Sequence, residues 1–280
     1  MPYELVGMDV GFYSRGGAYP LDTRCEILAA LGYQATNLTL WSEPAWSDLP
    51  LLGAAARENG LGVASIYLTI DLAAPGDAGW ERALDTIGSV EATRTVELAL
   101  LNEPAERSDP SGDGDARRFL DAALDRAHSN DVRLLLYPHT FAWMERPADA
   151  VRLAKGYDDP TLGITFAAFH WYAADGHDLP GTLAGVAPYL GMVNTNGSRP
   201  QSGSYYFPAT IEPIGDGEFD NFHLLGLLRD LGYAGPLGVQ SYGIGGDPYV
   251  HFGRSLTAVR DIEDRLDLHS DWVQLRDDHI

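Results

Sequence analysis

The stretch PLDTRCEILAALGYQATNLTLW (residues 20–41) contains the structural unit that decides the fold. Its first part is typical of a helix that begins near a cap at Asp22 or Thr23. The helix ends at Gly32, because glycine readily adopts the left-handed backbone of a helix terminus. The short apolar run ATNLTLW (35–41) follows and is typical of a buried strand. The stretch therefore predicts a helix that is followed at once by a strand.

The same order of helix and strand recurs along the whole chain. Three helices end in the similar phrases ALGY, ENGLG and DLGYAG, each just before a strand. The expected strands cover residues 5–12, 35–41, 62–70, 95–101, 132–138, 162–169, 190–196 and 236–242. This alternation is typical of an α/β protein, and the G-x-G-x-x-G fingerprint of an open dinucleotide-binding sheet does not follow the first strand. We expect a single (β/α)8 TIM barrel over residues 1–266 and a C-terminal tail over residues 267–280.

The charge of the chain excludes one class of partner. The sequence has 40 acidic and 19 basic residues, a net charge of −21, and Lys155 is its only lysine. Such a surface repels phosphate backbones, so we expect no nucleic-acid partner. The acidic, lysine-poor composition suits a high-salt cytoplasm, and a genome that encodes arginine in place of lysine explains it equally well.

The chain shows no sign of export or of membrane insertion. The first residues, MPYELVGMDV, lack the charged segment and the cleavage site of a secretory leader, and no apolar run reaches about 18 residues. We expect a cytoplasmic protein without a membrane partner. Cys25 is the only cysteine, so no intramolecular disulfide can form, and its helical context predicts a packed core thiol.

Ligand-binding side chains are expected at the carboxyl ends of the strands, where barrels of this kind carry their chemistry. Aromatic and hydrogen-bonding residues predominate there, and these suit a carbohydrate, since ring faces stack on aromatic side chains while amides and imidazoles bind hydroxyl groups. The predicted binding residues are Trp41, Glu43, Glu103, Trp171, Asn194, Asn196, Gln240 and Tyr242.

The tripeptide Tyr137-Pro138-His139 ends the fifth expected strand and is the strongest catalytic candidate. His170 ends the next strand, and neighbouring strands bring their ends close together. Pro138 fixes the turn that orients His139. Histidine suits proton transfer near neutral pH, and a tyrosine hydroxyl can donate to a developing oxyanion. We predict Tyr137, His139 and His170 as catalytic, with a structural role for the histidines as the alternative.

Three segments resemble the xylose isomerase-like TIM barrels, a family of sugar phosphate isomerases and epimerases that also includes family 2 AP endonucleases. They are YPHTFAWMERPADAVRLAK, DDPTLGITFAAFHWY and GPLGVQSYGIGGDPYVHFGRSL, and the resemblance covers about residues 3–266. It implies the barrel fold and action on a sugar. It also implies a divalent metal (Mn, Mg or Zn), held in epimerase-type members by Glu, Asp, His and Glu on strands five to eight.

This chain departs from that ligand pattern. The four positions fall on Tyr137, on Ala167, near Asn194 or Asn196, and on Gln240. Hard divalent cations need anionic oxygen or imidazole ligands to offset their dehydration. We therefore predict no ordinary metal site and a neutral polar pocket.

An atypical metal site built from His139, His170, Glu103 or Glu43 stays open at this stage, as does decay of an unused site.

The leading hypothesis is a sugar isomerase or epimerase that removes a proton next to a carbonyl, without the usual metal. A lyase or hydratase that acts on 3-keto-glycosides is one alternative, and a non-catalytic sugar-binding barrel is another. A neutral sugar is favoured over a sugar phosphate, because the mouth offers Arg199 but no lysine. The long insertion at residues 196–219 is expected to act as a lid. A homo-oligomer is compatible with the family.

Overall fold

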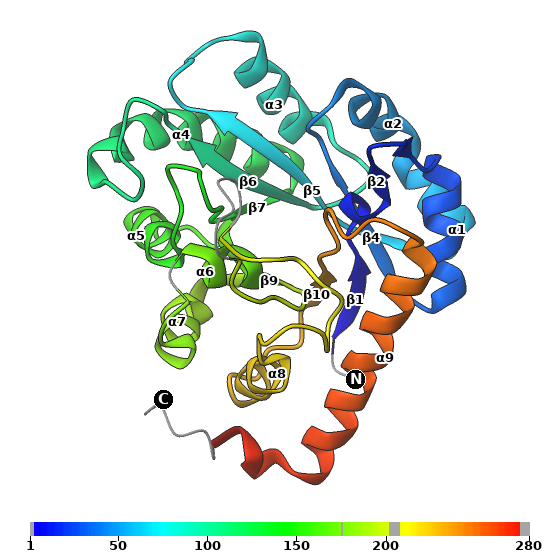
Figure 1. Ribbon diagram of the computed structural model, residues 1–280. Coiled ribbons are helices and arrows are strands. Elements are labelled where there is room, and N and C mark those ends of the chain that lie inside the picture. Colours follow the sequence, from blue (N-terminus) through cyan, green and yellow to red (C-terminus); the bar gives the residue numbers. More distant parts are fainter. Residues whose placement is uncertain (1–2, 175, 202–207, 275–280) are drawn as a thin grey trace.

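Eight parallel strands close into a barrel in the computed structural model, which describes residues 3–174, 176–201 and 208–274. The strand order is β1-β10-β9-β8-β7-β6-β5-β4, and β1 pairs with β4 to close the ring (Figure 1). The strands are β1 (Glu4–Gly7), β4 (Ala35–Thr39), β5 (Gly62–Asp71), β6 (Thr95–Leu101), β7 (Arg133–Leu136), β8 (Leu162–Ala167), β9 (Leu190–Thr195) and β10 (Pro236–Val239). The predicted (β/α)8 barrel is confirmed.

Helices surround the barrel as an outer ring (Figure 1). They are α1 (Leu21–Leu31), α2 (Glu43–Glu58), α3 (Ala78–Ser89), α4 (Asp113–Asn130), α5 (Pro147–Tyr157), α6 (Ala168–Ala174), α7 (Leu179–Val186), α8 (Asn221–Asp230) and α9 (Pro248–Leu268). Apolar side chains between the ring and the strands form the main core, and Cys25 is fully buried in it, as predicted. None of the described helices is long and apolar enough to cross a membrane.

Two local predictions at the start of the chain are wrong. Helix α1 begins at Leu21 after Pro20, so neither Asp22 nor Thr23 caps it, whereas Gly32 ends it in the left-handed conformation with φ 95°. The first strand stops at Gly7, and Asp9–Phe12 form a 3-10 helix. Hydrogen bonds between Asp9 and the neighbouring strand region replace the ladder there, because the Asp9 carboxylate accepts the backbone N–H of Thr39.

Inward-facing side chains fill the barrel in layers, because alternate residues of a strand point to opposite faces. The amino-terminal end is closed by Val6, Ala35, Leu135 and Met192, which form a small apolar cluster of their own. Glu97 of β6 pairs in register with Leu135 of this cluster and is fully buried. Polar side chains therefore begin inside the barrel, below the carboxyl ends of the strands.

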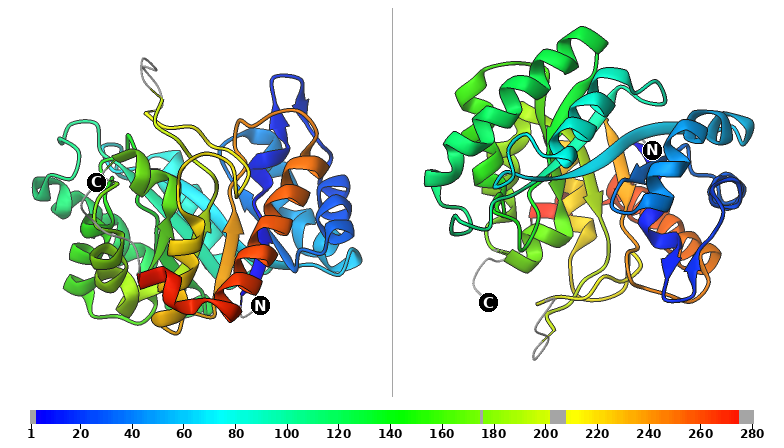
Figure 2. Two further views of the ribbon diagram at one scale, coloured as in Figure 1. Left: turned by 60° about the horizontal axis from the view of Figure 1, so that its bottom comes forward. Right: turned by 90° about the horizontal axis from the view of Figure 1, so that it is seen from above.

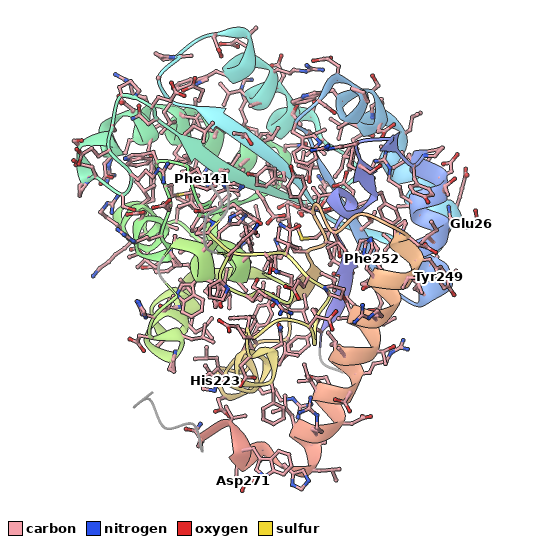
Figure 3. All side chains as sticks on the ribbon, viewed as in Figure 1. Glu26, Phe141, His223, Tyr249, Phe252 and Asp271 are labelled. Atoms are coloured by element: carbon pink, nitrogen blue, oxygen red, sulfur yellow. The ribbon has the colours of Figure 1, made fainter. Side chains whose placement is uncertain are left out.

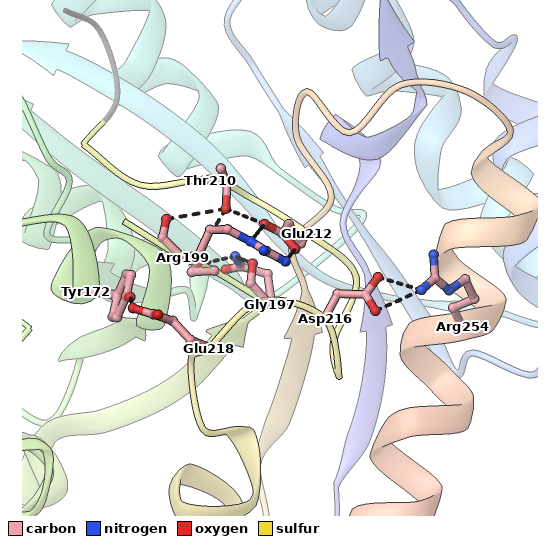
Figure 4. A network of polar contacts seen from close by, with 10 residues as sticks. Tyr172, Gly197, Arg199, Thr210, Glu212, Asp216, Glu218 and Arg254 are labelled. Carbon is pink, nitrogen blue, oxygen red and sulfur yellow. Dashed lines mark hydrogen bonds and ion pairs between the residues drawn. The ribbon is translucent and has the colours of Figure 1, made fainter. Parts of the chain in front are cut away.

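The insertion that follows β9 lies at the carboxyl end of the barrel, at the same end as the hairpin of β2 (Tyr13–Ser14) and β3 (Gly17–Ala18) (Figure 2). Isolated bridges join its two arms, and an ion pair between Arg199 and Glu212 ties them (Figure 4). A second ion pair links Asp216 to Arg254 of α9 (Figure 4). Residues 202–207 of the predicted lid lie outside the described residues, and its action as a lid stays a prediction.

The segment after α9 packs on the barrel's outer ring. Helix α9 runs through Leu268, two residues past the expected boundary at 266, and a short 3-10 helix follows. Val273 is buried against Gly226 of α8, while the ring of Trp272 stacks on His269 with centroids 4.0 Å apart.

Candidate functional site

The carboxyl ends of the strands surround a cavity of about 350 Å³, which lies within the size range of small-molecule sites. It opens at the end of the barrel that the insertion overlies, and Ile211 of the insertion is part of its wall. Six of the predicted site residues line it: Trp41, Tyr137, His139, His170, Gln240 and Tyr242.

The two histidines form the centre of this cavity. Their ring centroids lie 3.8 Å apart, which confirms the proximity expected from neighbouring strands. His170 does not end a strand, however. It lies in the first turn of α6, since β8 stops at Ala167 and the chain turns at once into a helix.

The peptide groups of Thr140 determine the tautomers of both rings. Nδ1 of His139 lies 2.6 Å from the carbonyl oxygen of Thr140 and must donate to it. The N–H of Thr140 donates to Nδ1 of His170 at 3.3 Å, so this nitrogen is an acceptor. In the neutral pair, His139 therefore keeps a lone pair at Nε2, whereas His170 carries its proton at Nε2. One ring can accept a proton while the other can donate one.

Burial keeps both rings neutral. It lowers the pKa of His139 below the usual 6.5. It lowers the pKa of His170 well below that value, and the nearby charge of a protonated His139 lowers it further. Desolvation disfavours the cationic form in each case. At neutral pH the pair is thus ready to accept a proton.

Two tyrosines stand beside the histidines as neutral hydrogen-bond donors. The Tyr137 ring lies 5.5 Å from His170 and 5.0 Å from Tyr67, in edge-to-face contacts. Burial raises the pKa of both hydroxyls above their usual value, and the charge of Glu97 raises that of Tyr137 further. Both hydroxyls therefore keep their protons near neutral pH, as a donor to an oxyanion must.

A buried carboxyl group lies below the cavity and was not predicted. Glu97 accepts hydrogen bonds from Ser65 at 2.5 Å, from Thr165 at 2.8 Å and from Asn194 at 3.4 Å. Burial raises the pKa of this carboxyl above its ordinary value, and the three donors only partly offset the effect. The network joins four strands and holds Asn194 below Tyr137.

Five predicted binding residues do not line the cavity. Asn194 belongs to the buried network, and Asn196 binds Gly197 and Ser198 at the start of the insertion. Trp171 is buried in the core against Phe166 and Phe219. Glu43 begins α2 on the surface and pairs with Arg82, and Glu103 is exposed. Glu43 is already the first residue of the helix that follows β4, so its side chain faces solvent there.

A family model for xylose isomerase-like TIM barrels matches residues 25–267. The chain belongs to the xylose isomerase-like TIM barrel family. The resemblance of its three segments is thereby confirmed. Comparison with curated proteins gives no significant match.

Solved structures of xylose isomerase-like barrels share the fold at low identity. An L-ribulose 3-epimerase gives a TM-score of 0.75 at 15% identity and covers 98% of this chain and 99% of its own. The D-allulose 3-epimerase from Methylomonas sp., solved in complex with D-allulose, gives 0.73 at 14% identity and covers 92% and 96%. A xylose isomerase-like TIM barrel/4-hydroxyphenylpyruvate dioxygenase fusion protein gives 0.75 at 15% identity, and this chain spans 45% of its length.

The divalent metal expected of epimerase-type members of this family does not fit the side chains of this chain. Its four ligand positions are predicted to fall on Tyr137, Ala167, Asn194 or Asn196, and Gln240, of which none offers an anionic oxygen or an imidazole. The described residues contain no group of three or more His, Cys, Asp or Glu side chains that could hold a metal ion. Oε1 of Gln240 is buried and has no hydrogen-bond partner among the described residues, so it can accept from a hydroxyl donor.

Sequence reasoning also missed much of the cavity wall. Inward alternation along the strands could have found some of these residues, since Thr39 and Thr69 both line the cavity. Glu97 had its own signal, a single carboxylate inside the apolar strand TVELALL. The missed wall residues of the strands and loops include Thr39, Thr69, Phe141, Phe169 and Ile211.

Proposed function

We propose that the protein is a sugar isomerase or epimerase that moves a proton next to the carbonyl of a neutral sugar or keto-sugar, without a divalent metal. The observation that carries the proposal is the complementary pair of neutral imidazoles at the centre of the cavity. His139 offers the lone pair of Nε2, and His170 offers the proton of Nε2, because Thr140 binds the other nitrogen of each ring.

In this mechanism His139 removes the proton from the carbon next to the carbonyl, and its imidazole becomes cationic. The electron pair of the C–H bond moves to the carbonyl oxygen, which accepts hydrogen bonds from His170 and Tyr137. Such donors stabilise the developing enolate most when they are already oriented in a site without bulk water. Return of the proton to the former carbonyl carbon, with transfer of the neighbouring hydroxyl proton to the former carbonyl oxygen, gives isomerisation. Delivery of a proton to the opposite face of the same carbon by a second donor gives epimerisation.

The rest of the cavity supports a neutral polyhydroxylated substrate. Gln240 is nearly buried and its Oε1 has no hydrogen-bond partner within the described part of the chain, so a substrate hydroxyl would satisfy it. No Asp, Glu, Lys or Arg of the described residues lines the cavity, which disfavours a sugar phosphate. The names of two structural neighbours, a D-allulose and an L-ribulose epimerase, also support a ketose.

A non-catalytic sugar-binding barrel is the second candidate. The neutral side chains at all four expected metal-ligand positions favour it, because they remove the chemistry that epimerase-type relatives use. The two candidates share the cavity and differ in whether a proton leaves the bound sugar.

Incubation in heavy water separates them. Wild-type protein would be incubated with D-allulose, D-fructose, L-ribulose and 3-keto-glucosides in D2O, and the sugars would be followed by NMR. The proposal predicts deuterium next to the carbonyl in at least one sugar, and loss of this exchange in His139→Gln. The matched control is His128→Gln, which changes a histidine paired with Asp159 on the surface. Binding without exchange would show a binding barrel, and an unsaturated product would show a lyase.

A further inference from the structure

The cavity is far more apolar than the polar pocket predicted from the sequence. Its hydrogen-bonding side chains include the two histidines, Tyr137 and Gln240, whereas apolar side chains from the segment after β1, from β6, from α6 and from the insertion form much of the remaining wall. A bare sugar would leave these apolar surfaces in contact with its hydroxyl groups. The wall therefore fits a ligand that has an apolar part in addition to a sugar ring.

Large aromatic side chains stand at the mouth of the cavity and are partly exposed to water. Trp41, Phe141 and Tyr242 are 45%, 40% and 37% exposed, and all three line the cavity. Trp41 and Tyr242 form an edge-to-face pair with ring centroids 5.4 Å apart. Exposed aromatic surface at the mouth of a cavity marks a place where a ligand buries apolar area.

Phe141 faces this pair from the other side of the mouth. Trp41 follows β4 and Tyr242 follows β10, the two neighbours of β1, while Phe141 follows β7, which stands opposite β1 in the closed ring. Figure 3 marks Phe141 in the loop after β7. The three rings thus form two walls across one opening.

The backbone of Phe141 is held in an unfavourable conformation. Its φ is 73°, in the left-handed region that bulky residues rarely adopt. Local bonds stabilise the turn: the Phe141 N–H donates to Glu145 at 3.0 Å, and the Ala142 N–H donates to the His139 carbonyl at 2.9 Å. Arg107 lies over the ring, 5.1 Å from its centroid. Glycine would adopt this backbone conformation with less strain, so a phenylalanine at this position points to a role for its ring at the cavity.

We propose that the ligand is a neutral sugar that carries a planar apolar substituent such as an aryl group. The sugar ring occupies the inner part of the cavity at His139 and His170. The substituent lies between the Trp41–Tyr242 pair and Phe141. This assignment rests on the proposed function for the position of the sugar, but the preference for an aryl group is a property of binding and needs no turnover.

The size of the preference follows from the contacts between rings. One well-placed aromatic pair tightens binding roughly 2- to 12-fold beyond the area that it buries. Contacts on two walls make a phenyl glycoside at least about tenfold tighter than its methyl partner. Loss of one wall should remove most of this ratio, because the substituent then faces water on that side.

Matched pairs of glycosides test the proposal by calorimetry. Methyl and phenyl β-glycosides of D-glucose, D-galactose and D-xylose would be titrated into the wild type, with phenol as a control for binding of the ring alone. The expected result is a phenyl-to-methyl ratio of about tenfold or more for at least one sugar, and weaker binding of phenol. Trp41→Ala and Phe141→Gly should each lower the ratio several-fold.

Two further variants keep the outcomes distinct. Phe141→Gly relieves the left-handed strain, so misfolding does not explain its loss of binding, and Trp272→Ala removes an exposed tryptophan from the tail as a matched control. Equal binding of methyl and phenyl partners, no binding of any phenyl glycoside, or a ratio retained in both mouth variants overturns the proposal. A normal ratio in His139→Gln, together with no deuterium exchange in the wild type, would reject the proposed catalysis and leave the aryl preference standing.

Discussion

Replacing Glu97 with glutamine probes the buried network below the cavity. In the unfolded chain this carboxyl ionises near its ordinary pKa of 4.5, and burial raises its pKa in the folded protein. Between these two pKa values the folded state binds more protons than the unfolded state. The contribution of Glu97 to stability is therefore fully present below pH 4.5 and is lost as the pH rises through the folded-state pKa.

The magnitude follows from this difference in proton binding. One proton corresponds to a slope of about 1.4 kcal/mol per pH unit, so at most about 3 kcal/mol is lost between pH 4.5 and pH 7. Glu97→Gln removes this slope and costs on the order of 1 kcal/mol at every pH, since an amide presents one acceptor oxygen where the two carboxyl oxygens accept from three donors. The variant should be less stable than the wild type at pH 4.5 and should gain on it steadily toward pH 7.

Urea unfolding of both proteins at intervals between pH 4.5 and 7.5 measures the difference. Glu43→Gln is the matched control, because Glu43 is exposed and its hydrogen bond to Arg82 lowers its pKa below the ordinary value. Its contribution is lost only as the pH falls below that range, so the control should show a constant difference. A constant difference for Glu97→Gln as well would refute the buried-carboxyl argument, and a variant that loses further stability relative to the wild type as the pH rises would reverse it.

Three further results are expected. His139→Ala should lower kcat about 10²- to 10⁴-fold while the sugar still binds, as measured by steady-state kinetics and calorimetry; a change in KM alone would contradict its role as base. Because burial lowers the pKa of His139, kcat/KM should stay level from pH 8 down to 6.5 and fall only at lower pH, so a rate that already falls between pH 8 and 7 would exclude it. Gly238→Ala places a Cβ against Oδ1 of Asn194, and urea unfolding should show a loss of about 1–3 kcal/mol; an unchanged midpoint would mean that Asn194 is free to move.

The fold could be predicted from the sequence because it repeats one local signal. Apolar runs and terminal glycines such as Gly32 recur in each helix–strand unit. Each unit can therefore be recognised from its own residues, without information on the rest of the chain. The predicted element boundaries were wrong where contacts between distant residues determine the local structure. Asp9 sits in an apolar run, yet its carboxylate bonds with the β4 backbone and turns the chain out of the first strand.

The site was predicted only in part, for a physical reason. Proximity of His139 and His170 follows from strand order, which the sequence gives directly. Their tautomers depend on both peptide groups of Thr140, a detail of backbone geometry that no spacing reveals. Glu43 shows the opposite failure, since a charged residue soon after a strand can belong to the next helix and face solvent.

Proton exchange in the presence of a chelator tests the central claim, metal-free proton transfer by His139, most directly. The wild type and His139→Gln would be incubated with the responsive sugar in D2O containing excess EDTA, and deuterium next to the carbonyl would be measured by NMR. We expect undiminished deuterium exchange in the wild type and none in His139→Gln. Exchange that stops with EDTA and returns with Mn²⁺ would contradict it.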